Sequence, residues 1–344
     1  MQQISLALVG FGNVGQALVR LLISKREILE RDFGFTWKIT GIATGRQGSA
    51  IDPQGIDPQH ALECIQNGAS LETLSKVPAL TSTLEFIRQV PADVLFENSP
   101  VNHSSGEPAA SHLRDALKRG MHAISANKGP VVHAYAELTA LAASHGKRYL
   151  FESAVMDGAP IFSLFRGSLP AMQVHGFQGI LNSCTNLMIG LMEDGQDFED
   201  TVRYAKSIGI TETDPASDID GWDAAIKVAA ICTVVMGIPL KPQQVQREGI
   251  RGITPQRIAE AKAAGERWKL VCRADLGADG SLTASVQPQR VSSRSPFYNI
   301  NGTSSYVQFA SDVLPGLGII ESDPGPETTA YGLLADLINA VRGM

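Results

Sequence analysis

Residues 4–32 read ISLALVGFGNVGQALVRLLISKREILERD, and this stretch decides how the chain begins to fold. Its apolar opening predicts a buried strand, and the residues after Gly15 predict a helix. Between them stands GFGNVG, the GxGxxG pattern in the strand, turn and helix context that it requires. The first glycine makes the turn, the second lets the backbone approach a pyrophosphate, and the third allows close helix packing. The stretch therefore predicts a dinucleotide site and a doubly wound parallel sheet.

The composition is that of a globular α/β protein. The chain has 344 residues, enough for two domains, of which 44% are hydrophobic and 19% charged. The net charge of −6, without a cluster of Lys or Arg, argues against nucleic acid as a partner. The four cysteines are widely spaced, which fits free thiols and disfavours a zinc site. Without a targeting signal, and with no apolar run longer than residues 228–240, we expect a cytoplasmic protein without a membrane partner.

The end of the second predicted strand, residues 37–43, bears on the choice of dinucleotide. NAD enzymes usually carry an acidic residue here, which binds the ribose hydroxyls. This chain instead continues as Thr44-Gly45-Arg46. A missing carboxylate and a following arginine suit a 2′-phosphate, so the sequence favours NADP, with NAD as the alternative. Residues 48–80 then predict a Gly- and Pro-rich loop followed by helical patches.

Polar residues follow two further predicted strands of the same sheet. The strand at residues 93–97 ends in Asn98-Ser99-Pro100, and the strand at residues 122–126 ends before Lys128. Ligands of open α/β sheets bind at the carboxyl ends of parallel strands. We therefore expect these four residues to lie near a ligand, although Lys128 could also be a surface lysine in a turn.

The second half of the chain has a different pattern. A strand at residues 177–181 runs into Asn182 and the segment 183–186, which is expected to cap a helix at residues 187–195. Segments KLVCRADL, LTASVQPQRV and SYVQFAS between residues 269 and 311 alternate as antiparallel strands do. A helix at residues 331–341 can return to the first domain. We expect an N-terminal Rossmann-type domain, residues 1–150 with 322–344, and an α+β domain, residues 151–321, with a mixed or antiparallel sheet.

An acidic loop precedes the most apolar helix of the chain, in GITETDPASDIDGWDAAIK, residues 209–227. Asp223 and Lys227 stand four residues apart and so share one helix face. A surface ion pair is the plain interpretation. However, the apolar run that follows predicts a buried helix, and ionised groups seldom enter a core without a partner or a purpose. The acids and the lysine are therefore candidates for binding something small and polar.

Five motifs together resemble the homoserine dehydrogenases, in the short form without the regulatory domain of longer members. They are GFGNVG at residues 10–15, ANKGP at 126–130, ESAVMDGAP at 152–160, GILNSCTN at 179–186 and ETDPASDIDGWDAAIK at 212–227. The last is the most specific, because its polar positions keep their spacing over sixteen residues. The family reduces aspartate 4-semialdehyde to homoserine with NAD(P)H, in threonine and methionine biosynthesis. The resemblance thus implies an oxidoreductase with a small amino-acid substrate.

The resemblance also assigns roles to individual residues. Acid–base catalysis is implied for Lys227 or Lys128, with Asp223 beside Lys227. Substrate contacts are implied for Glu212, Asp218, Asp223, Asn182 and Cys184. Cofactor contacts are implied for Gly10, Phe11, Gly12, Asn13, Val14, Gly15, Arg46, Asn98, Ser99, Pro100, Lys128 and Thr329. A monovalent cation, Na⁺ or K⁺, is implied at Glu152, Val155, Asp157 and Ala159. The family pairs its second domains, so we expect a homodimer or a higher homo-oligomer.

Some residues depart from the family pattern. Met156 replaces a usual glycine, Asp157 a small residue, and Ser183-Cys184 a Gly-Thr pair, while Ile210 stands where an aromatic residue is frequent. Three alternatives therefore stay open. The chain could oxidise a related amino or hydroxy acid, or it could be a non-catalytic NADP-binding sensor. It could also be an aldehyde dehydrogenase in which Cys184, as a thiolate at a helix N-terminus, attacks the carbonyl.

Overall fold

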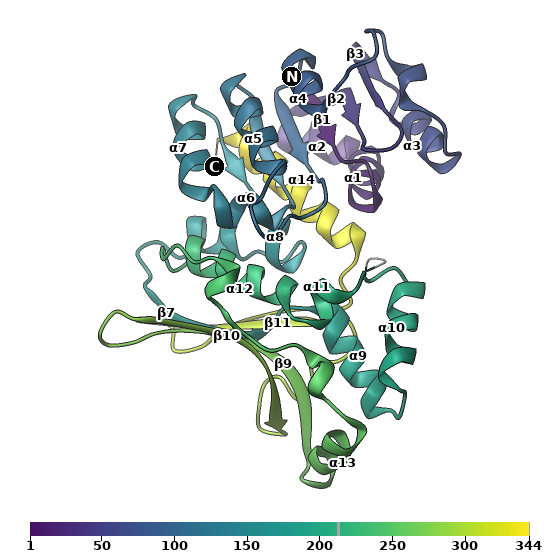
Figure 1. Ribbon diagram of the computed structural model, residues 1–344. Helices are drawn as coiled ribbons and strands as arrows, with labels where there is room; N and C mark the ends of the chain where they lie inside the picture. Colours follow the sequence, from purple (N-terminus) through teal and green to yellow (C-terminus); the bar gives the residue numbers. More distant parts are fainter. Residues whose placement is uncertain (212–213, 344) are drawn as a thin grey trace. The chain divides into compact units, whose positions relative to one another are not determined.

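The computed structural model describes residues 1–211 and 214–343 (Figure 1). The chain forms two compact units. The first consists of Met1–Pro160 together with the chain from Gly325 onward, and the second is Ile161–Pro324. Among the residues described, no helix has the length and apolar character that crossing a membrane requires.

The first unit is built on a six-stranded sheet of order β3-β2-β1-β4-β5-β6. Every neighbouring pair in it is parallel except β2 and β3. Its strands are β1 (Gln2–Val9), β2 (Phe35–Ala43), β3 (Ser49–Ile56), β4 (Val94–Glu97), β5 (His122–Ser125) and β6 (Tyr149–Leu150). This is the predicted Rossmann-type sheet, and its carboxyl edge carries the glycine turn after β1.

Strand β3 corrects the expectation of a loop at residues 48–80. It pairs antiparallel with β2, from Ala43 opposite Ser49 to Ile39 opposite Ile56. Pro53 and Gly55 weaken the strand pattern in the sequence. A proline is tolerated in β3 because an edge strand leaves half of its N–H groups unpaired. The helical patches expected within this range are α3 (Pro58–Gln66) and η1 (Leu71–Leu74), and α4 (Thr83–Gln89) follows beyond it.

Helices surround this first sheet in Figure 1. They are α1 (Asn13–Ser24), α2 (Arg26–Phe33), α5 (Ala109–Lys118), α6 (Lys128–His133), α7 (Tyr135–Ser144), α8 (Ser153–Met156) and α14 (Pro326–Arg342). Helix α14 returns to this unit and packs on α1, with Leu333 and Leu337 in the same core as Leu18 and Leu22. It begins five residues before the predicted position, with a proline in its first turn. Strand β6 has only two residues, and α8 begins soon after it, at Ser153.

The second unit has a six-stranded sheet of order β12-β11-β7-β9-β10-β8. All of its pairs are antiparallel except β10 and β8, which confirms the mixed sheet expected from the sequence. Its strands are β7 (Val174–Ile180), β8 (Gln246–Arg247), β9 (Glu266–Leu276), β10 (Leu282–Ser292), β11 (Ser305–Ser311) and β12 (Leu317–Glu321). Strands β8 and β12 were not foreseen, because short edge strands carry little periodicity.

The helical segments of the second unit include three that contact strand β9. These are α9 (Ser183–Glu193), α12 (Trp222–Val234) and α13 (Pro255–Ala263). The others are η2 (Leu164–Ser168), α10 (Phe198–Ser207), α11 (Ala216–Ile219), η3 (Pro242–Gln244) and η4 (Ile250–Gly252). Helix α9 begins four residues earlier than the sequence predicted, because Asn182, the first residue of the segment expected to cap it, is its N-cap. Helix α12 is buried from Ala224 to Ile226 and again from Val228 to Thr233, as its apolar sequence predicted.

Candidate active site

The three glycines of the turn after β1 differ in their steric surroundings. Gly10 has a φ of 89°, and a Cβ there would lie 2.5 Å from the Asn98 carbonyl oxygen. A Cβ at Gly15 would lie 2.7 Å from the carbonyl oxygen of Gly10. A Cβ at Gly12 would meet no atom within 4 Å. Gly12, the N-cap of α1, therefore borders open space at a helix N-terminus, where N–H groups attract a phosphate.

Asn98, at the carboxyl end of β4, provides a second sign of a ligand at this edge. Its backbone N–H donates to the carbonyl of Val9 at 2.7 Å, which ties it to the glycine turn. Its side-chain Oδ1 and Nδ2 atoms are both buried and have no hydrogen-bond partner among the residues that the structure describes. Because buried polar groups are nearly always satisfied, this amide needs a polar ligand or a water. The residues present thus fit a bound dinucleotide.

Lys128 is the first residue of α6, at the carboxyl edge predicted for it. The preceding Asn127 caps α6 by accepting a hydrogen bond from Gly129 N–H at 2.9 Å, and its Nδ2 donates to Ser99 O at 3.0 Å. The hydroxyl of Ser125 donates to the carbonyl of Glu97 at 2.9 Å. These bonds join the carboxyl ends of β4 and β5. They therefore hold Ser99, a predicted cofactor residue, and Lys128 at neighbouring strand ends.

Glu97 is the last residue of β4, and the sequence analysis did not identify it as a candidate site residue. Its side chain is fully buried, and one carboxylate oxygen accepts from the Ser99 hydroxyl and lies 3.2 Å from Nδ1 of His112. The other oxygen has no hydrogen-bond partner within residues 1–211 and 214–343. The sequence offered one signal for it, a glutamate at the end of an apolar strand.

Arg46 lies exposed in the loop between β2 and β3. The loop is closed by Thr44, whose N–H donates to Gly48 O at 3.0 Å and whose hydroxyl accepts from Gln47 N–H at 2.8 Å. The guanidinium is therefore accessible to a solvent-borne anion.

The segment predicted to hold a cation surrounds the short helix α8. Glu152, Val155 and Ala159 are buried. Asp157 has a φ of 43°, a conformation that residues other than glycine rarely adopt and that tends to occur at functional sites. The hydroxyl of Thr329 on α14 donates to its carboxylate. The structure thus brings a predicted cation ligand and a predicted cofactor residue together.

Asn182 is the centre of the polar cluster in the second unit. Its Oδ1 accepts from the N–H and the hydroxyl of Thr185, both at 2.8 Å, which caps α9. Its Nδ2 donates to Asp218 Oδ1 at 2.7 Å and to Asp223 Oδ2 at 3.0 Å. One amide therefore fixes the N-terminus of a helix and holds two carboxylates side by side.

Lys227 completes this cluster from the next turn of α12. Its Nζ lies 3.1 Å from Asp223 Oδ2 and donates to the carbonyl of Leu181 at 2.7 Å. The two side chains are 15% and 16% exposed, so the pair is largely desolvated yet still reachable by a ligand. A surface ion pair, the plain interpretation of the spacing, does not describe it.

Asp218 is the carboxyl group of the cluster whose pKa is raised. Burial and the neighbouring Asp223 carboxylate raise its pKa, while bonds from Thr211 and Asn182 and the charge of Lys227 oppose this. The hydroxyl of Thr211 donates to Asp218 Oδ2 at 2.6 Å. Since a raised carboxyl pKa reflects an unfavourable negative charge, a cationic ligand would stabilise the ionised form.

Cys184 follows the cap of α9 but points into the core. It is 2% exposed and its sulfur lies 3.9 Å from the sulfur of Met188. Burial, followed by the charge of Asp218, raises the pKa of its thiol. A nucleophilic cysteine needs the opposite shift, so the aldehyde dehydrogenase alternative is not favoured. Glu212, the remaining predicted substrate residue, lies outside the described residues.

The loop that carries the acids is held by residues that the sequence did not indicate. Arg247 on β8 donates to the carbonyl of Asp220, and its guanidinium carbon lies 3.8 Å from the ring centroid of Trp222. Arg251 bonds the Asp220 carboxylate at 2.6 Å. These contacts fix the turn before α12, where Gly221 has a φ of 77°. Nothing in the local pattern connects residues so far apart.

A dinucleotide fold in one unit and a carboxylate–lysine cluster in the other define a nicotinamide-dependent oxidoreductase. Residues 10–152 match the family model for the NAD-binding domain of homoserine dehydrogenase, and residues 160–338 match that for homoserine dehydrogenase itself. The chain therefore belongs to the homoserine dehydrogenase family, oxidoreductases that use NAD(P) to act on a CH–OH group.

Similar proteins cover nearly the whole chain. An NAD⁺-dependent homoserine dehydrogenase of Pseudomonas canavaninivorans is 34% identical over 98% of this chain and 96% of its own length. The homoserine dehydrogenase of Methanocaldococcus jannaschii is 33% identical over 96% and 97%. A hyperthermophilic archaeal homoserine dehydrogenase in complex with NADPH superposes with a TM-score of 0.83, at 27% identity over 100% and 99% of the two chains. These findings do not favour a sensor or an aldehyde dehydrogenase.

Proposed function

We propose that this chain interconverts L-homoserine and L-aspartate 4-semialdehyde, with Lys227 as the group that donates and accepts the proton. The first unit would hold the dinucleotide and the second the amino acid. The observation that carries the proposal is the cluster in which Asn182 joins Asp218 and Asp223 while Asp223 pairs with Lys227. An ordinary surface ion pair would not need an amide that donates hydrogen bonds to both carboxylates.

The dinucleotide, when bound, supplies or accepts the hydride at the substrate carbon. The protein must then give a proton to the developing alkoxide oxygen. Lys227 suits this role because Asp223 and the Leu181 carbonyl orient its ammonium from two sides. In the oxidative direction the same nitrogen removes the hydroxyl proton, and Asp223 stabilises the ammonium that forms.

Asp218 suits the second task, binding the α-ammonium of the substrate. Its pKa is raised by burial and by Asp223, and a substrate cation would relieve this unfavourable charge. Glu212, six residues earlier in the sequence, is proposed as a second carboxylate for the same ammonium. Uncharged alcohols of similar size would lack this interaction and are expected to be poor substrates.

Replacing each lysine tests the catalytic assignment. Lys227→Ala is expected to lower kcat by about two to four orders of magnitude, as loss of a general acid does. Lys128→Ala is expected to raise KM for the dinucleotide more than it lowers kcat. Circular dichroism and the melting temperature control for folding. Near-normal kcat in a folded Lys227→Ala variant, with a large loss in Lys128→Ala, would move the proton-transfer role to Lys128.

For the dinucleotide we propose NADP, bound through its 2′-phosphate by Arg46. The support is an exposed guanidinium after β2 and the absence of a carboxylate at that strand end. The Pseudomonas relative is an NAD⁺-dependent enzyme, so the test compares both dinucleotides. Arg46→Ala is expected to raise KM for NADPH about tenfold and to leave KM for NADH unchanged. A wild type that prefers NADH would overturn this assignment.

We also propose that Glu152, Val155, Asp157 and Ala159 bind Na⁺ or K⁺ beside α8. The strained backbone of Asp157 and its bond from Thr329 support a built turn rather than a loose loop. Activity in KCl or NaCl should exceed activity in choline chloride at equal ionic strength, and Asp157→Ala should remove the difference. Equal activity in all three salts would contradict the cation site. The homo-oligomer, expected to form through the second unit, is tested by light scattering.

A further inference from the structure

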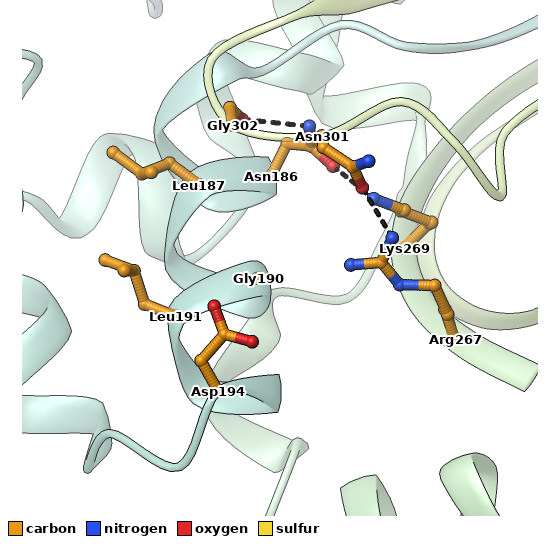
Figure 2. A pocket seen from close by; sticks show the side chains of 9 residues that line it. All are labelled: Asn186, Leu187, Gly190, Leu191, Asp194, Arg267, Lys269, Asn301 and Gly302. Carbon is orange, nitrogen blue, oxygen red and sulfur yellow. Dashed lines mark hydrogen bonds between the residues drawn. The ribbon is translucent and has the colours of Figure 1, made fainter.

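A cavity of about 240 Å³ opens in the second unit between helix α9, strand β9 and the segment before β11 (Figure 2). Its lining includes Asn186, Gly190, Leu191, Arg267, Lys269 and Asn301. Neither the lysine that we assign to catalysis nor the carboxylates beside it take part in the lining. The cavity begins one helical turn after Asn182 and follows α9 towards its C-terminal end.

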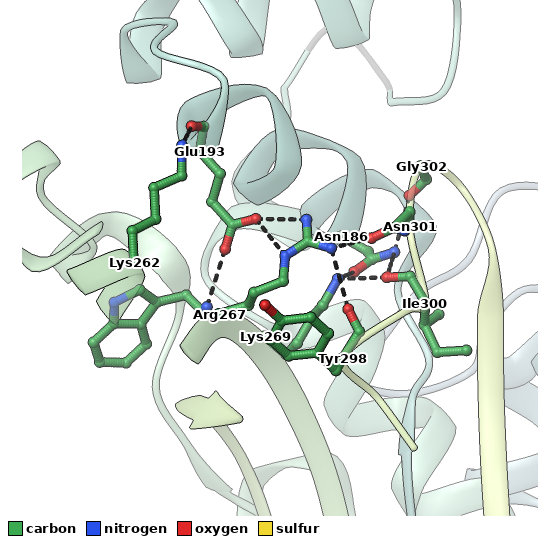
Figure 3. Close-up of polar contacts among 10 residues, drawn as sticks. Asn186, Glu193, Lys262, Arg267, Lys269, Tyr298, Ile300, Asn301 and Gly302 are labelled. Carbon is green, nitrogen blue, oxygen red and sulfur yellow. Dashed lines mark hydrogen bonds and ion pairs between the residues drawn. The ribbon is translucent and has the colours of Figure 1, made fainter. Parts of the chain in front are cut away.

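Lys269 places a positive charge at the inner end of this cavity. The residue is 1% exposed, and its Nζ donates to Asn186 Oδ1 at 2.9 Å and to the Ile300 carbonyl (Figure 3). An ammonium has three donors, and both of these partners are neutral. Among the residues that the structure describes, no carboxylate makes an ion pair with it. A buried charge without a counter-ion is unfavourable, so this end of the cavity attracts an anion.

Arg267 shows the contrast, because it forms an ion pair with a carboxylate, that of Glu193. Its Nε donates to Glu193 Oε2 at 2.7 Å, and its Nη1 donates to Tyr298 O at 3.1 Å and to the Asn301 side chain (Figure 3). Burial, followed by the charge of Arg267, lowers the pKa of Lys269 to about 8, while the charge of Glu193 acts in the opposite direction. The ammonium therefore still predominates at neutral pH, and an anion beside it would raise that pKa.

The middle of the cavity is made by a glycine inside a helix. Gly190 lies in the interior of α9, where glycine is less favourable than alanine. A Cβ on Gly190 would meet no atom within 4 Å, so packing within the chain does not require a glycine there. Leu187 and Leu191 line the cavity from one side of α9, and the two basic side chains lie on the other side in Figure 2. The site has one cationic end and one apolar wall.

We propose that this cavity binds a short-chain aliphatic carboxylate, with its head group at Lys269 and its chain over Gly190 and Leu191. A water occupies about 30 Å³ of liquid, so the space corresponds to about eight waters and suits a carboxylate of four or five carbons. The exposed Asp194 at the other end disfavours a second negative charge on the ligand. The proposal does not depend on the assignment of the catalytic residues.

Isothermal titration calorimetry of the full chain with sodium pentanoate tests the proposal, in the presence of saturating homoserine without a dinucleotide, so that the substrate site is occupied and no turnover occurs. Saturable binding is expected, with n-pentylammonium chloride at the same ionic strength giving none. Gly190→Leu should weaken pentanoate binding at least tenfold, because its side chain would fill the cavity while Lys269 stays in place. Gly167→Leu is the matched control, since a Cβ there also meets no atom within 4 Å.

Three results would overturn the site. They are absence of saturable binding to the wild type, equal affinity in Gly190→Leu, and equal binding of n-pentylammonium. Turnover of homoserine by Gly190→Leu should stay within about twofold of the wild type, because the substituted position lies outside the catalytic cluster. Loss of turnover on Lys227→Ala with intact pentanoate binding would show that the two sites are independent.

Discussion

Replacing Asn182 by alanine removes a helix cap and two hydrogen bonds to carboxylates with one change. Loss of an Asn cap costs about 1 kcal/mol. A hydrogen bond to a charged group contributes about 1.5–3 kcal/mol, and Asn182 donates two, to Asp218 and Asp223. Both carboxylates keep other donors and some solvent, so the bonds will not add in full. We expect a total loss of about 3 kcal/mol in the free energy of unfolding.

The assay compares this variant with a cap of the same kind outside the cluster. Asp57 caps α3 in the first unit, where its Oδ1 accepts from Gln59 N–H at 2.8 Å and from His60 N–H at 3.1 Å. Urea unfolding should show a loss of about 1 kcal/mol for Asp57→Ala, as for an isolated cap. The loss for Asn182→Ala should be about three times larger. Asp57→Ala should leave the kinetic constants for homoserine unchanged.

Activity should respond in a direction that the electrostatics fix. The bond from Asn182 lowers the pKa of Asp218, against the effects of burial and of Asp223. Without it the pKa of Asp218 rises further, so the acid limb of kcat/KM should move to higher pH in Asn182→Ala. KM for homoserine should rise about tenfold, because fewer molecules carry the ionised carboxylate that binds the ammonium.

Two outcomes would refute this reasoning. Equal stability losses for Asn182→Ala and Asp57→Ala would mean that the bonds to the two carboxylates contribute nothing measurable. An unchanged acid limb in a folded Asn182→Ala variant would mean that Asp218 does not titrate in the kinetic profile. Asn182→Asp serves as a further check, because it keeps the cap and adds a third carboxylate, which should shift the limb further still.

Gly12→Ala should keep the melting temperature and raise KM for the dinucleotide at least tenfold. Gly15→Ala should instead lower the free energy of unfolding by about 1–3 kcal/mol, because its Cβ would lie 2.7 Å from Gly10 O. Thermal melts and cofactor titrations distinguish the two effects. Cys184→Ala should retain kcat within about threefold, since burial raises the thiol pKa, and a loss of several orders of magnitude would restore the nucleophile hypothesis. Asp218→Asn should raise stability near pH 8, by thermal melts. The folded-state pKa of Asp218 is raised, so its stabilising contribution is present below the unfolded pKa and is lost as pH rises through the folded value. The advantage of this variant should therefore disappear towards pH 4, and an advantage that is constant with pH would contradict it.

The sequence by itself determined the features that depend on neighbours along the chain. GFGNVG could be assigned to a strand, turn and helix because its glycines have the fixed spacing that such a turn requires. Asp223 and Lys227 could be paired because four residues make about one helical turn, and the structure has them 3.1 Å apart. The alternating segments of the second unit likewise gave its antiparallel strands.

Other features were decided only by the tertiary structure. Asn182 bonds residues that lie 36 and 41 positions away, and Arg247 reaches back across 27 positions to the turn at Asp220. Cys184 looked like a helix-start nucleophile but points into the core. The edge strand β3 was hidden by Pro53 and Gly55. In each case the local pattern is compatible with several structures.

The physical reason is the range of the interactions. Helical spacing and turn chemistry act over a few residues and leave a periodic signature, so the glycine turn and the Asp223–Lys227 pair can be recognised in a single sequence. Burial, desolvation and hydrogen bonds between distant segments depend on which faces pack together. A single polar residue in the sequence does not indicate which residue it will contact in the fold. Lys269 shows this most clearly, because an ordinary lysine in a strand becomes a buried charge only when α9 and the segment before β11 close over it.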